Sequence, residues 1–272
     1  MKSTPRPLLL LHADRVLMER LNRIAGDRFQ LLRVKSWAEL WAGVAEAPPA
    51  ALVLVDPYFG EMNGRGPSPH LSHLLKAFPS ATVVVATEST PSRYPDIRQM
   101  GEWGVAEVLQ LDEDTSRESV RRRLLSARGQ PLRRLLAHDP GFPLTGRARA
   151  LMDAAVETVM MGGYPRDLAK TLGFSPSTLL RWCERSQLPT PRRLLLWMRV
   201  LFASALLDDP GHSVFSVGLA CGYSGDQALR RAIRAVIPLT PTQLRERGAF
   251  ETASNAFFQE LAALRDEQAD RR

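Results

Sequence analysis

Two short segments in the second half of the chain carry arginine and glutamine side chains that could recognise nucleic-acid bases. Arg181 lies in the first segment, and Gln227 and Arg231 lie in the second. The guanidinium group of arginine can donate two hydrogen bonds to guanine, and the amide of glutamine can pair in the same way with adenine. We therefore expect these three side chains to read bases in the major groove of double-stranded DNA. That chemistry requires them to project from exposed helix faces.

Neighbouring positions in the same segments complete a candidate DNA-binding surface. We expect Arg185, Arg230 and Arg234 to meet phosphates, which add affinity and salt dependence but little sequence information. Leu180 cannot hydrogen-bond a base edge, although it could touch a thymine methyl group. The other positions predicted to contact DNA are Ser177, Thr178, Gly225 and Asp226. The alternative interpretation is that all these residues form the solvated faces of ordinary helices.

A repeated sequence pattern indicates how the two segments fold. Gly-Phe-Ser at residues 173–175 precedes Leu-Leu-Arg and, eight residues further on, Thr-Pro at 190–191. Gly-Tyr-Ser at 222–224 precedes Leu-Arg-Arg and, eight residues further on, Thr-Pro at 240–241. Glycine permits the positive φ of a sharp turn, serine and threonine cap helices, and proline suits the first helical position. Each copy therefore predicts a helix-turn-helix, and the matched punctuation disfavours the interpretation as ordinary helices.

Apolar side chains recur with a helical period between these signals. They predict one inward stripe in each reading helix, formed by Leu179, Trp182 and Cys183 in the first and by Leu229, Ala232, Ile233 and Val236 in the second. A strongly apolar helix is predicted over residues 192–207, with a length of about 24 Å. Ser213 can cap the helix that follows it. Such a strut could hold the two reading helices near the ~34 Å spacing of successive major grooves.

Residues 147–249 resemble the DNA-binding domain of AraC/XylS-type transcription regulators. Besides the motifs above, the resemblance rests on Asp-Leu-Ala at 167–169, Cys at 221 and Thr-Pro-x-x-Leu-Arg at 240–245. It implies two helix-turn-helix units joined by a long helix, which bind promoter DNA as an activator or a repressor. It also implies one extra residue in the second reading helix. The sequence departs from the family's usual pattern at Leu229, where a large aromatic residue is common, and at Gly218, where alanine is common.

The first 130 residues alternate between apolar runs and helical patterns. Runs that predict buried strands lie at residues 8–11, 51–55 and 82–85, with weaker candidates at 29–34 and 105–111. Ser36 and Thr115 are each followed three residues later by glutamate, which indicates a capping box at the start of a helix. The alternation predicts a doubly wound α/β domain with a flavodoxin-like, five-stranded parallel sheet.

Three polar residues follow the predicted strands at the edge of the sheet where ligands gather in such folds. Asp14, Asp56 and Thr87 come after the first, third and fourth strands along the chain. The segment resembles a response-regulator receiver domain, which implies Asp56 as phosphoryl acceptor and Thr87 as switch hydroxyl. Receivers hold Mg²⁺ with an acidic pair after the first strand, where this chain offers Asp14 alone, and carry a lysine where this chain has Leu111. We therefore favour a pseudo-receiver that serves dimerisation or sensing over a phosphorylation switch at Asp56.

Length and motif positions predict two domains and two smaller segments. The 272 residues divide into an α/β domain at 1–129, a linker at 130–146, the DNA-binding domain at 147–249 and a carboxyl-terminal helix at 250–272. That last helix carries Phe257, Phe258, Leu261 and Leu264 on one face. The sequence leaves open which of the two domains this face packs against.

Charge and composition indicate the kind of partner. The net charge of +7 and the isoelectric point near 10.0 favour an anionic partner such as double-stranded DNA. Cys183 and Cys221 are expected to be buried free thiols, and no pattern indicates an enzyme, a cofactor or a metal site. We expect a cytoplasmic regulator with no membrane partner, which forms a homodimer and meets RNA polymerase. The alternative is a regulator that has lost tight DNA binding and acts by pairing with another protein.

Overall fold

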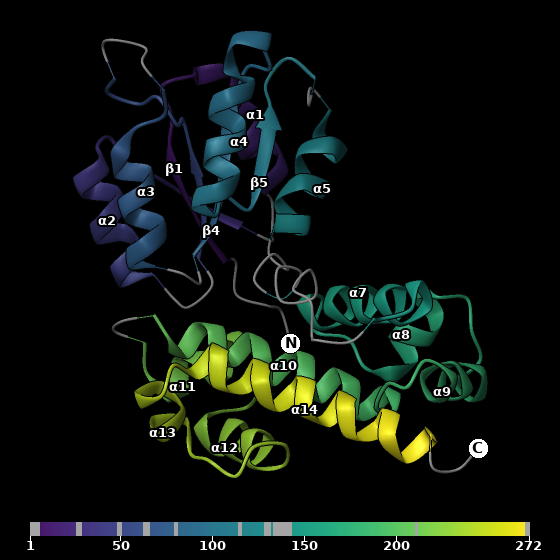
Figure 1. Cartoon of the computed structure of the whole chain (residues 1–272). Coiled ribbons are helices and arrows are strands. Elements are labelled where there is room, and N and C mark those ends of the chain that lie inside the picture. The colour runs from purple at the N-terminus through teal and green to yellow at the C-terminus, as the bar shows by residue number, and fades with distance from the viewer. Residues whose placement is uncertain are drawn as a thin grey trace. The chain divides into compact units, whose positions relative to one another are not determined.

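The chain folds into two compact units that meet near Gln130 in the sequence (Figure 1). The structure is a computed structural model, and the residues it describes are 6–25, 29–47, 51–61, 66–78, 81–113, 116–127, 132, 143–209 and 212–269. Within these residues, the first unit contains the strands and the second is built from helices. None of the helices in the described part of the chain combines the length and apolarity that a membrane crossing requires.

The first unit is built on a parallel sheet with strand order β2-β1-β3-β4-β5. The strands are β1 (Arg6–Leu11), β2 (Phe29–Arg33), β3 (Leu52–Val55), β4 (Thr82–Thr87) and β5 (Glu107–Gln110). In the register, Leu9 pairs with Val53, which pairs with Val83. This is the flavodoxin-like order, so the five predicted strands and the fold class are confirmed.

Helices cover both faces of this sheet because its strands are apolar on both sides. One face packs against α1 (Arg15–Ala25) and α5 (Arg117–Ala127), and the other against α2 (Trp37–Glu46), α3 (Pro69–Ala77) and α4 (Tyr94–Trp103). Successive residues of β1 serve opposite faces: Leu8 belongs to the core under α1 and α5, and Leu9 to the core under α2 and α3.

The predicted helix starts in this unit are partly confirmed. Ser36 Oγ accepts a hydrogen bond from the Glu39 backbone N–H (3.1 Å), as a cap should. The Glu39 carboxylate, however, accepts from the Lys35 N–H (2.8 Å), one residue before the position that a capping box requires. Thr115 lies outside the described residues, and Ser116 Oγ accepts from the Ser119 N–H at the start of α5 (3.0 Å).

The second unit is organised around one central helix. Its helices are α7 (Gly146–Met160), α8 (Pro165–Thr171), α9 (Pro176–Arg185), α10 (Pro191–Leu207), α11 (Val214–Ala220), α12 (Asp226–Arg234), α13 (Pro241–Glu246) and α14 (Ala249–Ala269). The predicted strut is confirmed as α10, whose Leu194, Trp197 and Leu201 are at most 1% exposed. Helices pack against α10 on several sides, so its apolar surface is the core that joins both predicted helix-turn-helix units.

The carboxyl-terminal helix α14 packs within this second unit. In Figure 1 it lies along α10, and it also contacts α13. Phe257 and Leu261 are buried, whereas Phe258 and Leu264 are half-buried at the margin of the contact. The rings of Trp197 on α10 and Phe257 lie 5.5 Å apart. The apolar face that the sequence left without an assigned partner therefore belongs to the core around α10.

Candidate nucleic-acid interface

The two predicted turns have the same backbone conformation. Gly173 has φ +68° and Gly222 has φ +81°, in the left-handed region that favours glycine. The residue after each glycine, Phe174 or Tyr223, donates its backbone N–H to the carbonyl five residues earlier, at 2.8 and 2.9 Å. These bonds satisfy carbonyl groups that would otherwise be left over at the ends of α8 and α11. The repeat in the sequence is therefore a repeat in structure.

The reading helices begin differently in the two units. Ser175 caps α9 by accepting from the Thr178 N–H (3.1 Å), and Pro176 occupies the first helical position, as predicted. Ser224 does not cap α12, because Gly225 stands between it and the helix, which begins at Asp226. The extra residue of the second helix-turn-helix thus lies in the turn. The expectation that it lies in the reading helix is therefore wrong.

Close packing accompanies this inserted glycine. A Cβ atom on Gly218 of α11 would lie 3.0 Å from the Gly225 carbonyl oxygen, so glycine lets the two helices of the second helix-turn-helix approach closely.

The helices that follow the two reading helices, α10 and α13, also begin differently. Thr240 Oγ1 accepts from the Gln243 N–H (3.3 Å), whereas Thr190 makes no such side-chain cap. The expected cap at Thr190 is therefore wrong, although Pro191 does begin α10.

The inner face of α9 is anchored by apolar and aromatic contacts. Leu179 and Cys183 are buried, and burial raises the pKa of the Cys183 thiol to about 11. Trp182 is half-buried between two groups: the Phe174 ring, whose centroid is 4.5 Å from its own, and the Arg147 guanidinium, 4.6 Å above it. These contacts on one face orient the opposite face of α9 toward solvent.

That outer face of α9 carries most of the side chains predicted to meet DNA. Ser177, Arg181 and Arg185 are exposed, and Leu180 is 38% exposed. Thr178 is half-buried, with its hydroxyl 2.8 Å from Ser175 Oγ. Its hydroxyl is thus partly engaged in the helix start, while the two arginines remain available to a partner.

The second reading helix, α12, presents a stronger positive surface. Leu229 and Ile233 are fully buried, which turns Gln227, Arg231 and Arg234 outward, where all three are exposed. Arg230 and Asp226, one helical turn apart, form an ion pair at 3.5 Å in which both side chains remain partly exposed. Gly225 is half-buried at the start of the helix.

The first helices of the two units differ at corresponding positions that the sequence reasoning did not single out. Arg166 and Lys170 are exposed on α8, and the equivalent residues on α11 are Phe215 and Leu219, which are 54% and 51% exposed. The correspondence follows from the shared turn, because each residue lies the same distance before Gly173 or Gly222. Extending the repeat comparison upstream of the glycines would have revealed this contrast.

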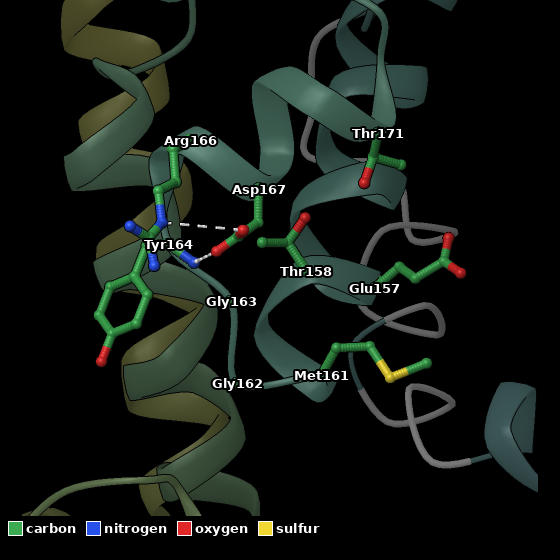
Figure 2. Close-up of a pocket in the computed structure, with 9 residues that line it drawn as sticks. All are labelled: Glu157, Thr158, Met161, Gly162, Gly163, Tyr164, Arg166, Asp167 and Thr171. Atoms are coloured by element: carbon green, nitrogen blue, oxygen red, sulfur yellow. Dashed lines mark hydrogen bonds and ion pairs between the residues drawn. The ribbon is translucent and has the colours of Figure 1, made fainter.

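A shallow open depression of about 440 Å³ lies between α7 and α8 (Figure 2). In Figure 2 the Asp167 carboxylate points toward Tyr164 and Arg166: it accepts from the Tyr164 backbone N–H (2.8 Å), and Arg166 Nε lies 3.9 Å from it. Glu157 adds a second acidic side chain to the lining. Because two carboxylates outweigh the single guanidinium of Arg166 in this lining, we do not assign the depression to the candidate DNA surface.

The polar residues at the edge of the α/β sheet are engaged with the backbone. Asp14 Oδ1 accepts from the Val16 N–H (2.7 Å) at the start of α1, and Asp56 Oδ1 accepts from the Tyr58 N–H (2.9 Å) after β3. Thr87 is 7% exposed, and its hydroxyl donates a long hydrogen bond (3.4 Å) to the Glu88 carbonyl. Leu111 is half-buried against the core under α1 and α5.

Side chains from three other elements hold the loop that follows Asp56. Tyr58 donates its hydroxyl to Asp96 Oδ2 (2.9 Å), and the Arg93 guanidinium lies 3.6 Å from its ring centroid. Burial and the hydrogen bond to Asp96 raise the pKa of Tyr58 to about 12. Trp37 Nε1 donates to the Phe59 carbonyl (2.9 Å). No local sequence signal indicated these contacts, which fix the loop beside Asp56.

Comparison with known proteins identifies the helical unit. Residues 168–247 match a family model described as "Helix-turn-helix domain". Full-length FixJ from B. japonicum is 12% identical with a TM-score of 0.38, over 81% of this chain and 98% of that one. The xylose-binding transcription activator XylR is 14% identical with a TM-score of 0.35, over 91% and 71%. No curated protein matches the chain significantly in sequence. Residues 168–247 thus match a helix-turn-helix domain, in line with the predicted resemblance to AraC/XylS-type regulators, and a flavodoxin-like α/β domain precedes it in the chain.

Proposed function

We propose that the chain is a sequence-specific transcription regulator whose two helix-turn-helix units read successive major grooves of promoter DNA. In this proposal Arg181, Gln227 and Arg231 contact base edges, and Arg185 and Arg234 contact phosphates. Arg230 joins them as a phosphate contact, with Asp226 holding it in place. RNA polymerase is the further partner expected of an activator.

One observation carries this proposal: the same turn occurs twice, and each turn precedes a helix whose buried face leaves arginines exposed on the other. Gly173 and Gly222 have matching φ values and matching hydrogen bonds after them. The alternative interpretation as ordinary solvated helices does not explain why both segments share the turn geometry and the cationic outer face. The positive net charge of +7 supports the same partner.

The α/β domain has the role of pairing two chains, which would place four reading helices on repeated promoter sites. Three features argue against a phosphorylation switch as the role of this domain. The carboxylates of Asp14 and Asp56 each accept a backbone hydrogen bond, and Leu111 provides an apolar side chain where a cation would be needed. Phosphoryl transfer to a carboxylate requires cations that neutralise the developing charge.

Selection of bound fragments from a random DNA pool by the full chain tests the proposal. We expect a recurrent motif with two subsites about one helical turn apart, and a steep fall in affinity as salt rises from 50 to 200 mM, by roughly a thousand-fold or more. Sedimentation of the complex measures how many chains bind one fragment. Absence of selective binding even at low salt would favour the alternative, a regulator that acts by pairing with another protein.

A further inference from the structure

Helix α14 contacts the other helices of the helical unit through one apolar seam and through polar contacts at three places along its length. Its seam toward α10 consists of Ala249, Ala253, Phe257 and Leu261, each at most 1% exposed and each four residues from the next. Such a row is a ridge that fits the groove of a neighbouring helix. Phe257 meets Trp197 of α10 within this seam, at 5.5 Å between ring centroids. The apolar contact thus follows the helix for more than three turns.

Polar contacts secure the start of α14 to the end of α10. Asp208, the residue directly after α10, accepts from the backbone N–H groups of Ala249 (2.6 Å) and Phe250 (2.9 Å), one with each carboxylate oxygen. A carboxylate at a helix start satisfies donors that have no partner inside the helix and faces the positive end of the helix dipole. This end of α14 therefore lies where α10 leads into the second helix-turn-helix unit.

The middle of α14 is joined to the opposite end of α10. Glu260 accepts two hydrogen bonds from Arg193, both at 2.6 Å, in the bidentate geometry that is strongest for such pairs. Arg193 lies in the first turn of α10, directly after the first helix-turn-helix unit. The same guanidinium donates a longer hydrogen bond (3.5 Å) to the carbonyl of Ala235, the residue directly after the second reading helix.

Toward its carboxyl end, α14 contacts the segment just before α7, where the helical unit begins. Arg265 donates to the carbonyl of Pro143 (2.9 Å), just upstream of α7. From Ala249 to Arg265 the helix spans about 24 Å, which is about the length of α10 itself. Helix α14 runs antiparallel to α10 and is attached at both ends and in the middle. It therefore reinforces α10, which in the described part of the chain is the only long helix that joins the two helix-turn-helix motifs.

We propose that α14 is a splint that sets the separation and relative orientation of the two reading helices, and that Glu260 and Arg193 are its positioning residues. This inference rests on the proposed function for its consequence, which is selectivity for the spacing between two DNA subsites. A splinted pair of readers would bind one spacing well, whereas a loosely joined pair would tolerate others. Neither residue needs to touch DNA for this effect.

The direct test measures the distance between the reading helices in the full chain without DNA. Spin labels on Ser177→Cys and Gln227→Cys, both exposed first-turn positions, report that distance by pulsed electron resonance, and both native cysteines are buried. We expect a single narrow distribution that broadens when Glu260→Gln is added. Glu267→Gln, an exposed position on the same helix, is the matched control and should leave the distribution narrow.

The second test uses DNA selected by the unmodified protein, with one base pair added or removed between the subsites. Glu260→Gln should reduce the preference for the original spacing by about five-fold, while affinity for a fragment with one subsite changes less than two-fold. The charge exchange Arg193→Glu with Glu260→Arg should restore the preference. If Arg193 were only a phosphate contact, Arg193→Glu would weaken all fragments alike and Glu260→Arg would not rescue it.

The outcomes separate the two proposals. A folded Glu260→Gln protein with an unchanged distance distribution and unchanged spacing preference would overturn the splint. Arg193→Gln removes the same ion pair from α10 and replaces Glu260→Gln if circular dichroism shows that the latter does not fold. Failure of the unmodified protein to select any DNA would refute the proposed function, while the distance measurement would still decide whether α14 fixes the reading helices.

Discussion

Replacing Arg231 by alanine should weaken specific DNA binding with little effect on folding. Its side chain is exposed on α12 and makes no hydrogen bond or ion pair with another described residue. Alanine is at least as good a helix former, so the free energy of unfolding should change by less than about 0.5 kcal/mol. If Arg231 pairs with a guanine, its loss costs about 1–3 kcal/mol of binding, or roughly 5- to 150-fold in Kd.

The measurement compares Kd on the selected operator, on operators altered at single base pairs and on unrelated DNA, each at two salt concentrations. Loss of discrimination at one base pair, with affinity for unrelated DNA nearly unchanged, is the expected result. Arg230→Ala is the matched control, since its partly exposed side chain is engaged with Asp226 and should weaken all sequences slightly and equally. An equal loss on every DNA for Arg231→Ala, with a salt slope reduced by about one, would refute the base contact and leave a phosphate contact.

Three further changes test other parts of the structure. Asp56→Asn should leave DNA affinity within about two-fold, because an amide oxygen can still accept from the Tyr58 N–H, and a larger change would restore the phosphorylation switch. Phe257→Ala should lower the free energy of unfolding in urea by about 3–5 kcal/mol, because it empties the seam beside Trp197; a loss below about 1 kcal/mol would mean that α14 is not packed there. Cys183, whose pKa is raised to about 11 by burial, should stay a thiol at pH 8 and react with iodoacetamide only after unfolding, so rapid native labelling would contradict its burial.

The parts of the fold that were predictable from sequence are those with local signals. Strands such as β3 and β4 were visible because a parallel strand covered on both faces is a continuous apolar run. The turns at Gly173 and Gly222 were visible because the backbone conformation itself requires glycine. The length of α10 followed from the apolar run that predicted a helix over residues 192–207.

Contacts between distant residues had no such signal. Arg193 and Glu260 are 67 residues apart in sequence, and Tyr58 and Asp96 are 38 apart, so neither pair could be matched before the helices were placed. The position of the inserted residue was also misjudged, because a serine before a helix normally caps it and nothing in the sequence ranked Gly225 above Ser224. Gln187, with φ +57°, lies two residues after the end of α9 in a conformation that usually belongs to glycine, and residue type alone gave no warning of it.

The two helix-turn-helix units share a backbone but distribute their charges differently. In the first unit, cations lie on both helices, at Arg166 and Lys170 of α8 and at Arg181 and Arg185 of α9. In the second, the described arginines are concentrated on α12, and α11 presents Phe215 and Leu219 instead. Because phosphate contacts depend on charge, Lys170 and Arg185 would add backbone contacts beside the Arg181 base contact in the proposed complex, whereas the second helix-turn-helix would make its contacts from α12 alone. Two reading helices with unequal roles are selective for the spacing between their DNA subsites only if their separation is fixed. We propose that α14 fixes this separation.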